Sequence, residues 1–319
     1  MAERRIVAID IGGTKIASAL VILGDERPQV VSPASVPTDA QRGGEAVLKT
    51  VIDQALDVIA RTGETPEGVG ISAAGTVDIQ TGDITYANDL MPGWGGTHLG
   101  AAVSEACQLP CRVLNEVHAH ALGEARWGAG REASSCLVVA VGTGVGGAFV
   151  EDGHIMLGAH GEAGHIGHVN CAAAAGVTCS CGAVGHMESV ASGTGIIREY
   201  LRLGGDPAGE GDRPLDGAII NARAASGDPC AIAAQQRSGH ALGEVIGSMC
   251  NMLDPDRVIL SGSVARCGAV WHDAMDESFA SSVMPPVAGT AIVSGELGGD
   301  APLIGAAEHF ISSAYAGQR

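Results

Sequence analysis

Residues 6–21, IVAIDIGGTKIASALV, decide how the rest of the chain is interpreted. An apolar run is followed by the pair Gly12-Gly13, and a second apolar run begins after Lys15. This pattern predicts a strand, a tight turn and a second strand. Glycine has no Cβ and lets backbone N–H groups approach a phosphate closely, while Thr14 and Lys15 add a hydroxyl donor and a positive charge. An ordinary Gly-Gly hairpin remains the alternative for this stretch taken alone.

A second copy of this plan occurs at residues 136–150, CLVVAVGTGVGGAFV. Two apolar runs again flank a loop, which is predicted to contain Gly142, Thr143, Gly144, Gly146 and Gly147. Two related phosphate loops in two halves of one chain indicate an internal duplication. The glycine spacing also fits GxGxxG, but a dinucleotide-binding fold needs a helix directly after the loop. A strand and an Asp-Gly hairpin turn are expected here instead, so we reject that interpretation.

Polar residues stand where several predicted strands end. Asp10 closes the first strand and is placed to hold water around Mg²⁺. Asn115 and Glu116 lie between a strand and a helix, where open α/β sheets deliver side chains to a cleft. A third glycine turn, at Gly262, also follows a strand and is placed to cover the adenosine end of a nucleotide.

Apolar periodicity predicts the remaining elements. The expected helices cover 43–61, 99–107, 115–127, 188–200, 229–253, 271–282 and 301–314. Besides the strand pairs around the two loops, the expected strands cover 68–74, 111–114, 257–260 and 290–293. Strands alternate with helices and no low-complexity linker divides the chain, so the sequence predicts an α/β class throughout.

Composition excludes several classes of protein. The 319 residues are enough for two domains, and 46% hydrophobic content with 3% aromatics and 48 glycines indicates a loop-rich α/β enzyme with an aliphatic core. The formal net charge of -18 repels phosphate backbones and anionic membrane surfaces, so neither a nucleic acid nor a membrane is expected as a partner. Because ATP is also an anion, a site for it has to be built from local donors.

The sequence also bears on location. No signal peptide is recognised, and no apolar run reaches the roughly 18 residues of a membrane span. Nine cysteines, an odd number, do not suggest a disulfide framework in a chain of this length. A cytoplasmic location is therefore expected.

Four motifs in one order resemble the ROK family (repressors, open reading frames, sugar kinases). They are DIGGTK at 10–15, VGTGVGG at 141–147, GHIGH at 164–168 and CSCG at 179–182. The resemblance covers nearly the whole chain. It implies a duplicated actin-like ATPase fold of the ribonuclease H-like kind, with two α/β domains around a cleft. It also implies phosphorylation of a sugar hydroxyl by Mg-ATP.

The resemblance further implies a domain organisation. A small N-terminal α/β domain is expected at 1–118, joined by the final helix at 301–316. A large domain at 119–300 is expected to carry a zinc-binding loop and the surface of a homodimer. Repressor members carry a DNA-binding helix-turn-helix ahead of the first phosphate loop. Asp10 lies too near the start for one, which favours a kinase over a regulator.

The catalytic assignment follows from the same resemblance. The family's Asn-Asp pair, which holds the sugar and supplies the general base, matches Asn115 and Glu116. A carboxylate is what the chemistry needs, because it accepts the hydroxyl proton as the oxygen attacks the γ-phosphate. Glutamate reaches about one bond further than aspartate, and a misplacement of about 1 Å can cost roughly 10²-fold in rate. Glu116 is therefore a repositioned base, the mark of a weakened enzyme, or simply a solvated acid in the first turn of a helix.

His165 stands where most family members have a glutamate that contacts the sugar. Bacterial N-acetylmannosamine kinases resemble this sequence in carrying Ala-Gly-His-Ile-Gly-His. A histidine can donate or accept a hydrogen bond, whereas a carboxylate only accepts. The resemblance assigns the sugar to Gly75, Asn88, Asn115, His165, His168 and Glu188. It assigns ATP and Mg²⁺ to Asp10, Gly12, Gly13, Thr14, Lys15, Gly142, Thr143, Gly144, Gly146 and Gly262.

The family's structural zinc, usually held by one His and three Cys, matches His168, Cys179, Cys181 and His186. Two Cys and two His still complete a tetrahedral set. Cys171 and His160 are competing ligands, and a group of reduced cysteines with a surface histidine is the alternative without metal. The zinc is expected to be structural and to fix the loop that carries His165 and His168.

Taken together, the sequence predicts an ATP-dependent sugar kinase, with N-acetylmannosamine as the first choice and its 6-phosphate as the product. A glucokinase or an N-acetylglucosamine kinase is the alternative within the enzyme class. A sugar-binding sensor with weak or no kinase activity is the alternative from another class, and Glu116 is the residue that favours it. The phosphate donor, the zinc occupancy and the choice between dimer and tetramer stay open.

Overall fold

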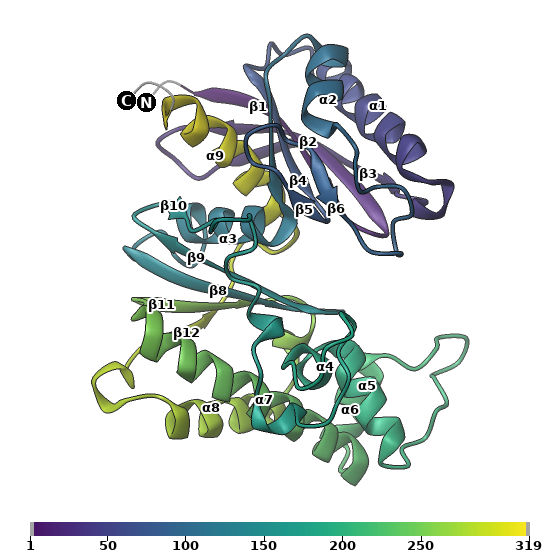
Figure 1. Ribbon diagram of the computed structural model, residues 1–319, viewed down its shortest axis with the longest axis vertical. Helices are drawn as coiled ribbons and strands as arrows, with labels where there is room; N and C mark the ends of the chain where they lie inside the picture. The colour runs from purple at the N-terminus through teal and green to yellow at the C-terminus, as the bar shows by residue number, and fades with distance from the viewer. Residues whose placement is uncertain (1–2, 317–319) are drawn as a thin grey trace. The chain divides into compact units, whose positions relative to one another are not determined.

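The structure, a computed structural model, describes residues 3–316, which divide into two compact units. The first unit comprises residues 3–134, 149–163 and 295–316, and the second comprises 135–148 and 164–294. The first unit therefore continues past the predicted boundary at 118, and the division into domains at 1–118 and 119–300 stays a prediction. Figure 1 shows the elements of both units.

The elements of the first part of the chain follow one another closely. The strands are β1 (Arg4–Ile11), β2 (Lys15–Leu23), β3 (Gln29–Pro37), β4 (Gly68–Ala73), β5 (Thr76–Val77), β6 (Ile84–Tyr86) and β7 (Cys111–Asn115). The helices are α1 (Gly44–Thr62), α2 (Leu99–Cys107) and α3 (Glu116–Trp127), with a short 3-10 helix η1 (Ala40–Arg42).

The remaining elements begin with a second strand pair. The strands are β8 (Ser135–Val141), β9 (Val145–Glu151), β10 (His154–Ile155), β11 (Arg257–Ser261) and β12 (Ala291–Ser294). The helices are α4 (Glu188–Ala191), α5 (Gly193–Arg202), α6 (Gly217–Ala225), α7 (Pro229–Leu253), α8 (Ala269–Ser282) and α9 (Ala301–Ala316). Short 3-10 helices are η2 (Ile166–His168), η3 (Ala172–Ala174), η4 (Val264–Arg266), η5 (Pro285–Val287) and η6 (Gly298–Asp300).

The two large sheets repeat one topology. Their strand orders are β3-β2-β1-β4-β7 and β10-β9-β8-β11-β12, so each strand of the first sheet has a counterpart at the same position in the second. In both sheets the two strands joined by a glycine turn are neighbours, and the next strand of the sheet pairs in parallel with the first of them. The internal duplication inferred from the two loops is thereby confirmed.

The core of the first unit lies on both faces of its sheet. Along β1, Val7 and Ile9 pack into a cluster with α1 and α2, while Ile6 and Ala8 pack with α9 on the other face (Figure 1). Alternate residues of a strand point to opposite faces, so a strand covered on both sides is apolar throughout. This explains why the opening strand is an unbroken apolar run. It also places the final helix on the first unit, as the family resemblance implies.

In the second unit, α7 and α8 approach each other along a seam of glycines. A Cβ at Gly239 would lie 2.4 Å from the carbonyl oxygen of Trp271, and one at Gly243 would lie 2.2 Å from that of Met275. Gly247, one turn further along α7, is less crowded, with a Cβ position 2.8 Å from Ser282 Cβ. Residues four apart share one helix face, so the seam lets two helix backbones touch.

The structure departs from the sequence predictions in a few places. The helix expected at 188–200 is wrong as a single element, because Ser192 interrupts it and its side chain accepts a hydrogen bond from Gly195 N–H at the start of α5. β3 and α6 were not expected. β3 is an edge strand that carries Pro33 and Pro37, so its pattern is not that of a buried strand.

Among residues 3–316, no helix is both long enough and apolar enough to cross a membrane.

The glycine seam leads to a stability prediction. We expect Gly243→Ala to lower the free energy of unfolding by about 1–3 kcal/mol, because the new methyl group collides with the α8 backbone. Gly217→Ala in α6 is the matched control: a Cβ there meets no atom within 4 Å, so we expect a gain of up to about 1 kcal/mol. Chemical denaturation of both variants measures the difference, and equal stability of the two would contradict the seam.

Candidate active site

The first glycine turn joins β1 to β2 and leaves its backbone open. Gly12 N–H donates to the carbonyl oxygen of Lys15 at 3.0 Å, which closes the turn. Thr38 holds the turn from the side, with its N–H donating to Thr14 O at 3.0 Å and its hydroxyl to Gly12 O at 2.7 Å. A Cβ at Gly13 would meet no atom within 4 Å, so the fold itself does not need glycine there. The bare, exposed backbone suits the close approach of an anion.

Asp10 lies at the same end of β1. In the parallel register of β1 and β4 it stands opposite Ser72, whose hydroxyl donates to Asp10 Oδ1 at 2.6 Å. Burial raises the pKa of the Asp10 carboxyl, while the Ser72 hydrogen bond and the charge of Lys15 act to lower it. The hydrogen bond keeps the Asp10 carboxylate in one orientation. A carboxylate that holds hydrated Mg²⁺ needs such a fixed orientation.

Glu116 is the first residue of α3 and is partly buried. Burial, and in second place the charge of Asp10, raise the pKa of its carboxyl to about 7. A solvated acid at a helix start would instead have its pKa lowered by the helix dipole. The surroundings of Glu116 therefore do not match that alternative. A carboxyl group with a pKa near 7 is suited to accept a proton at neutral pH.

Asn115 fixes the position of Glu116. As the N-cap of α3, its Oδ1 accepts hydrogen bonds from Val117 N at 2.9 Å and His118 N at 3.4 Å. Its Nδ2 donates to Gly75 O at 2.9 Å. Only one of the two amide N–H groups is used in these bonds. Asn115 therefore has a structural role in addition to the ligand-binding role expected from the sequence.

Two other predicted sugar positions lie in loops of the first unit. Gly75 follows β4 with φ +103°, and a Cβ there would lie 2.7 Å from Tyr86 O, so only glycine fits. Asn88 is exposed between β6 and α2, and its Oδ1 accepts a hydrogen bond from Leu90 N at 3.1 Å. This local bond shapes the loop around Asn88.

The second glycine loop joins β8 to β9 and is held by the junction of α4 and α5. Gly142 N–H donates to Gly144 O at 2.9 Å within the loop. From the junction, Gly193 N–H donates to Gly142 O at 2.8 Å, and the Thr194 hydroxyl donates to Thr143 O at 2.9 Å. A Cβ at Gly142 would meet no atom within 4 Å, as at Gly13 in the first turn.

The second glycine loop is shorter than predicted, because it ends before Gly146. Gly146 and Gly147 belong to β9, so the loop itself is Gly142–Gly144. A Cβ at Gly147 would lie 2.8 Å from Ile166, and one at Gly262 would lie 2.3 Å from Val141 O. Packing therefore accounts for the glycines at positions 147 and 262.

The four predicted metal ligands gather in one place in the second unit. One donor atom from each of His168, Cys179, Cys181 and His186 lies within 4.8 Å of all the others. The two histidine Nδ1 atoms are 3.2 Å apart, and Cys181 Sγ is 3.2 Å from His186 Nδ1. The two competing ligands, Cys171 and His160, are not part of this group in the described part of the chain.

The donor set suits zinc. Tetrahedral Zn–N bonds of about 2.0–2.1 Å and Zn–S bonds of about 2.3 Å place neighbouring ligand atoms roughly 3.3–3.8 Å apart. The distances of 3.2 Å above, and 3.9 Å from Cys179 Sγ to His168 Nδ1, are close to that requirement. His165, the proposed sugar residue, lies beside the group with its ring stacked on that of His168 at a centroid distance of 6.2 Å.

Glu188 connects this group to the second glycine loop. Its Oε2 accepts a hydrogen bond from Val145 N at 2.9 Å, and its Oε1 accepts one from the Ser180 hydroxyl at 2.8 Å. A Cβ at Gly144 would lie 2.7 Å from Glu188 Oε2. From the sequence, Glu188 was expected to contact the sugar. Ser180 was not expected to contribute, because no sequence pattern marks an exposed serine such as this one.

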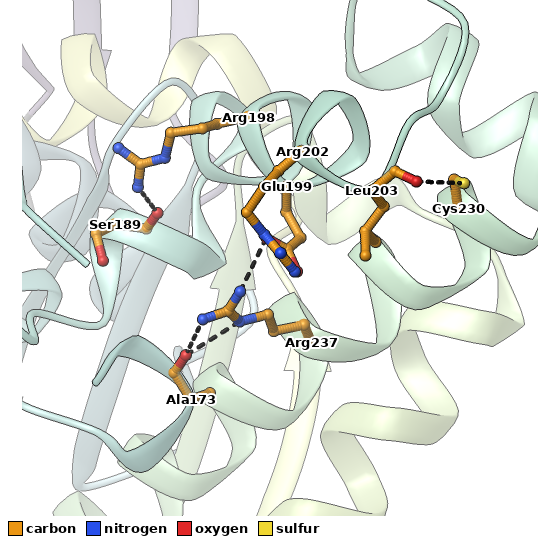
Figure 2. A network of polar contacts seen from close by, with 8 residues as sticks. All are labelled: Ala173, Ser189, Arg198, Glu199, Arg202, Leu203, Cys230 and Arg237. Carbon is orange, nitrogen blue, oxygen red and sulfur yellow. Dashed lines mark hydrogen bonds and ion pairs between the residues drawn. The ribbon is translucent and has the colours of Figure 1, made fainter. Parts of the chain in front are cut away.

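A network of charged side chains contacts the cysteine-rich loop, by which we mean residues 171–186 (Figure 2). Arg237 of α7 forms an ion pair with Glu199 of α5 at 2.8 Å and donates to Ala173 O at 2.6 and 3.0 Å. Arg202, followed by Arg237, lowers the pKa of the Glu199 carboxyl to about 2. Arg198 also donates to Ser189 O, next to Glu188. This network holds the loop and the start of α4 against α5 and α7.

The chain is similar to several known proteins. The model of the ROK family matches residues 6–312. A glucokinase of Halalkalibacterium halodurans is 31% identical over 320 residues, which covers 96% of this chain and 94% of the relative. An N-acetylmannosamine kinase of Yersinia pseudotuberculosis is 33% identical over 264 residues, or 81% of this chain and 82% of the relative.

A solved structure is similar over almost the full length. It is a ROK family glucokinase from Streptomyces griseus in complex with glucose and AMPPNP. The two chains are 28% identical with a TM-score of 0.78, and the match covers 95% of this chain and 98% of the other.

The proximity of two carboxylates leads to a prediction about titration. We expect Asp10→Asn to lower the pKa of Glu116 from about 7 towards, but not to, its ordinary value, because the neighbouring charge is removed and burial remains. Glu116 is then ionised at lower pH than in the parent protein. Carboxyl-carbon NMR titration measures the shift, and the exposed Glu132→Gln is the control expected to leave it unchanged. An unchanged Glu116 pKa in Asp10→Asn would contradict the pairing.

Proposed function

The chain belongs to the ROK family and is an ATP-dependent sugar kinase, and from that premise we propose that it converts N-acetylmannosamine to its 6-phosphate. Its fold is the duplicated actin-like ATPase fold of that family. The observation that carries the choice of sugar is His165, within Ala-Gly-His-Ile-Gly-His at 163–168. The similarity to an N-acetylmannosamine kinase supports this choice.

In the proposed mechanism Glu116 is the general base. The sugar 6-hydroxyl oxygen attacks the γ-phosphorus of ATP while its proton passes to the Glu116 carboxylate. A bond forms between that oxygen and phosphorus, the bond to the bridging oxygen of ADP breaks, and ADP leaves with the electron pair. The raised pKa of Glu116, about 7, supports this role because the carboxylate is a stronger base than an ordinary glutamate.

The other site residues bind and orient the reactants. We assign the phosphates to the open backbone of the Gly12–Lys15 turn and the Gly142–Gly144 loop. The spare amide N–H of Asn115 is assigned to the sugar. Mg²⁺, when bound beside the Asp10 carboxylate, neutralises charge on the phosphates. The hydrogen bond from Ser72 supports the assignment of Asp10 because it keeps that carboxylate in one orientation.

We also propose that the group of His168, Cys179, Cys181 and His186 holds a structural zinc ion. The spacing of the four donor atoms and the mixed nitrogen and sulfur ligands support this. Zinc held there would fix the loop beside His165, so its loss is expected to weaken sugar binding. A homodimer in the cytoplasm remains part of the proposal on family grounds.

Glucose is the second candidate substrate. The observation that favours it is the glucokinase relative, whose similarity extends over 96% of this chain, compared with 81% for the N-acetylmannosamine kinase. A sugar-binding sensor is the alternative from another class, because Glu116 stands where the family has aspartate. The pKa of Glu116 argues for a working base, since it is tuned towards neutral pH.

The substrate is tested by a coupled ADP-release assay with Mg-ATP and N-acetylmannosamine, N-acetylglucosamine, glucose or mannose. We expect the highest kcat/KM with N-acetylmannosamine. We expect His165→Ala to raise the KM for that sugar about tenfold, the cost of one lost hydrogen bond, with the KM for ATP unchanged. His154→Ala, which removes an exposed histidine elsewhere, is the matched control.

Each outcome of that assay has a clear meaning. Preference for glucose keeps the kinase and removes His165 as the marker of substrate. No turnover with any of the sugars, in protein that binds one of them, supports the sensor. A large gain in turnover in Glu116→Asp indicates a weakened enzyme, whereas a loss indicates a site adapted to glutamate.

The metal proposal is tested by elemental analysis. We expect about one zinc ion per chain, and loss of that zinc with a lower unfolding midpoint in Cys179→Ser. Cys230→Ser is the matched control, because Cys230 lies outside the group and its contact with Leu203 O can be kept by a hydroxyl. Absence of zinc from purified parent protein would falsify the assignment.

A further inference from the structure

We propose that Glu188 is a positioning residue for the second glycine loop and that it links the geometry of this loop to the Cys/His group. By the Cys/His group we mean His168, Cys179, Cys181 and His186. The inference rests on the proposed function in one respect, that the Gly142–Gly144 loop receives nucleotide phosphates. It adds a role to the family-based expectation for Glu188, which is contact with the sugar, because each carboxylate oxygen can accept a second hydrogen bond.

Both carboxylate oxygens of Glu188 are engaged within the protein. Oε2 accepts from Val145 N–H at 2.9 Å, the residue directly after the glycine loop. Oε1 accepts from the Ser180 hydroxyl at 2.8 Å and lies 3.8 Å from Cys179 Sγ. A carboxylate that receives a backbone N–H and a hydroxyl is held in one orientation by charge-assisted hydrogen bonds. Glu188 is therefore a bridge between two loops rather than a side chain directed at solvent.

Glu188 contacts the loop at Gly144, a position where glycine is required. A Cβ at Gly144 would lie 2.7 Å from Glu188 Oε2, and Gly144 does not have a positive φ. The carboxylate thus occupies the space beside Gly144 and fixes the end of the loop. The other end is fixed by Gly193 N–H, which donates to Gly142 O at 2.8 Å. Residues 188–194 therefore clamp the loop at both ends.

The segment that carries Glu188 is itself anchored. Arg198 donates to Ser189 O, and the Ser192 side chain caps α5 by accepting from Gly195 N–H at 3.1 Å (Figure 2 shows the Arg198 contact). On the other side, Ser180 stands between Cys179 and Cys181. A shift of these two cysteines therefore moves the Ser180 hydroxyl, which donates to Glu188, whereas α5 stays fixed. The Cys/His group and the phosphate loop are coupled through one carboxylate.

The test measures binding of AMPPNP with Mg²⁺ by calorimetry, without sugar, in zinc-loaded protein. We expect Ser180→Ala to weaken binding about threefold to tenfold, the effect of one hydrogen bond, and Glu188→Ala to weaken it by about tenfold or more. Glu188→Gln should stay within about threefold of the parent, because its amide oxygen can still accept from Val145 N–H. Thr178→Ala removes an exposed threonine hydroxyl from the same loop and is the control expected to bind as the parent does.

Metal removal provides a second readout. Stripping the metal with a chelator, followed by return to excess Mg²⁺, should weaken AMPPNP binding in the parent protein. The same treatment should have a much smaller effect in Glu188→Ala, because two perturbations of one pathway are not additive. Equal effects in the two proteins would overturn the coupling.

The outcomes separate this inference from the proposed function. Failure of the parent protein to bind AMPPNP contradicts the proposed phosphate site itself. Normal AMPPNP binding by Ser180→Ala and Glu188→Ala, with a raised KM for the sugar, overturns the inference alone and leaves Glu188 as a sugar ligand only. Parent-like binding by Glu188→Gln together with weak binding by Glu188→Ala supports positioning by hydrogen bonds over a role that needs the charge.

Discussion

The parallel pairing of β1, β4 and β7 is the constraint on which the candidate site depends. It sets Asp10 opposite Ser72 and Ala73 opposite Asn115, so polar side chains from three separate stretches of chain meet at one edge of the sheet. Parallel strands end at the same edge, and this brings residues 10, 72 and 115 to one edge of the sheet. β1 itself is buried on both faces of this sheet.

The same edge of the sheet also sets the basicity of the Glu116 carboxylate. Asp10 and Glu116 are both withdrawn from water, and burial, followed by the charge of Asp10, raises the pKa of Glu116 to about 7. A carboxylate with an ordinary pKa would be a weaker base, and a fully buried one would stay protonated. The N-cap bonds of Asn115 hold Glu116 at this intermediate position. An enzyme that removes a hydroxyl proton benefits from a base tuned in this way.

Duplication supplied two similar glycine loops, but their supports differ. In the first unit, Thr38 holds the turn through backbone carbonyls. In the second unit, the helix junction at 188–194 does so, and Glu188 extends that support to the cysteine-rich loop. The first loop is thus held by the residue directly after β3 and the second by the junction of α4 and α5. The difference explains why the second loop is the one expected to respond to a metal.

Local pattern determined much of this protein. The periodicity of apolar residues predicted the bounds of α1, α2 and α7 to within one residue, and the two glycine loops indicated the duplication. Both signals are local, because they arise between neighbours in the chain. Family motifs pointed to the four Cys and His residues that the fold brings together. The strand position of Gly146 and the roles of Ser72, Ser180 and Glu188 were decided only by tertiary structure. Each of the three roles depends on a partner at least eight residues away along the chain, and burial, hydrogen bonding and pKa are set by such partners, which no local pattern contains.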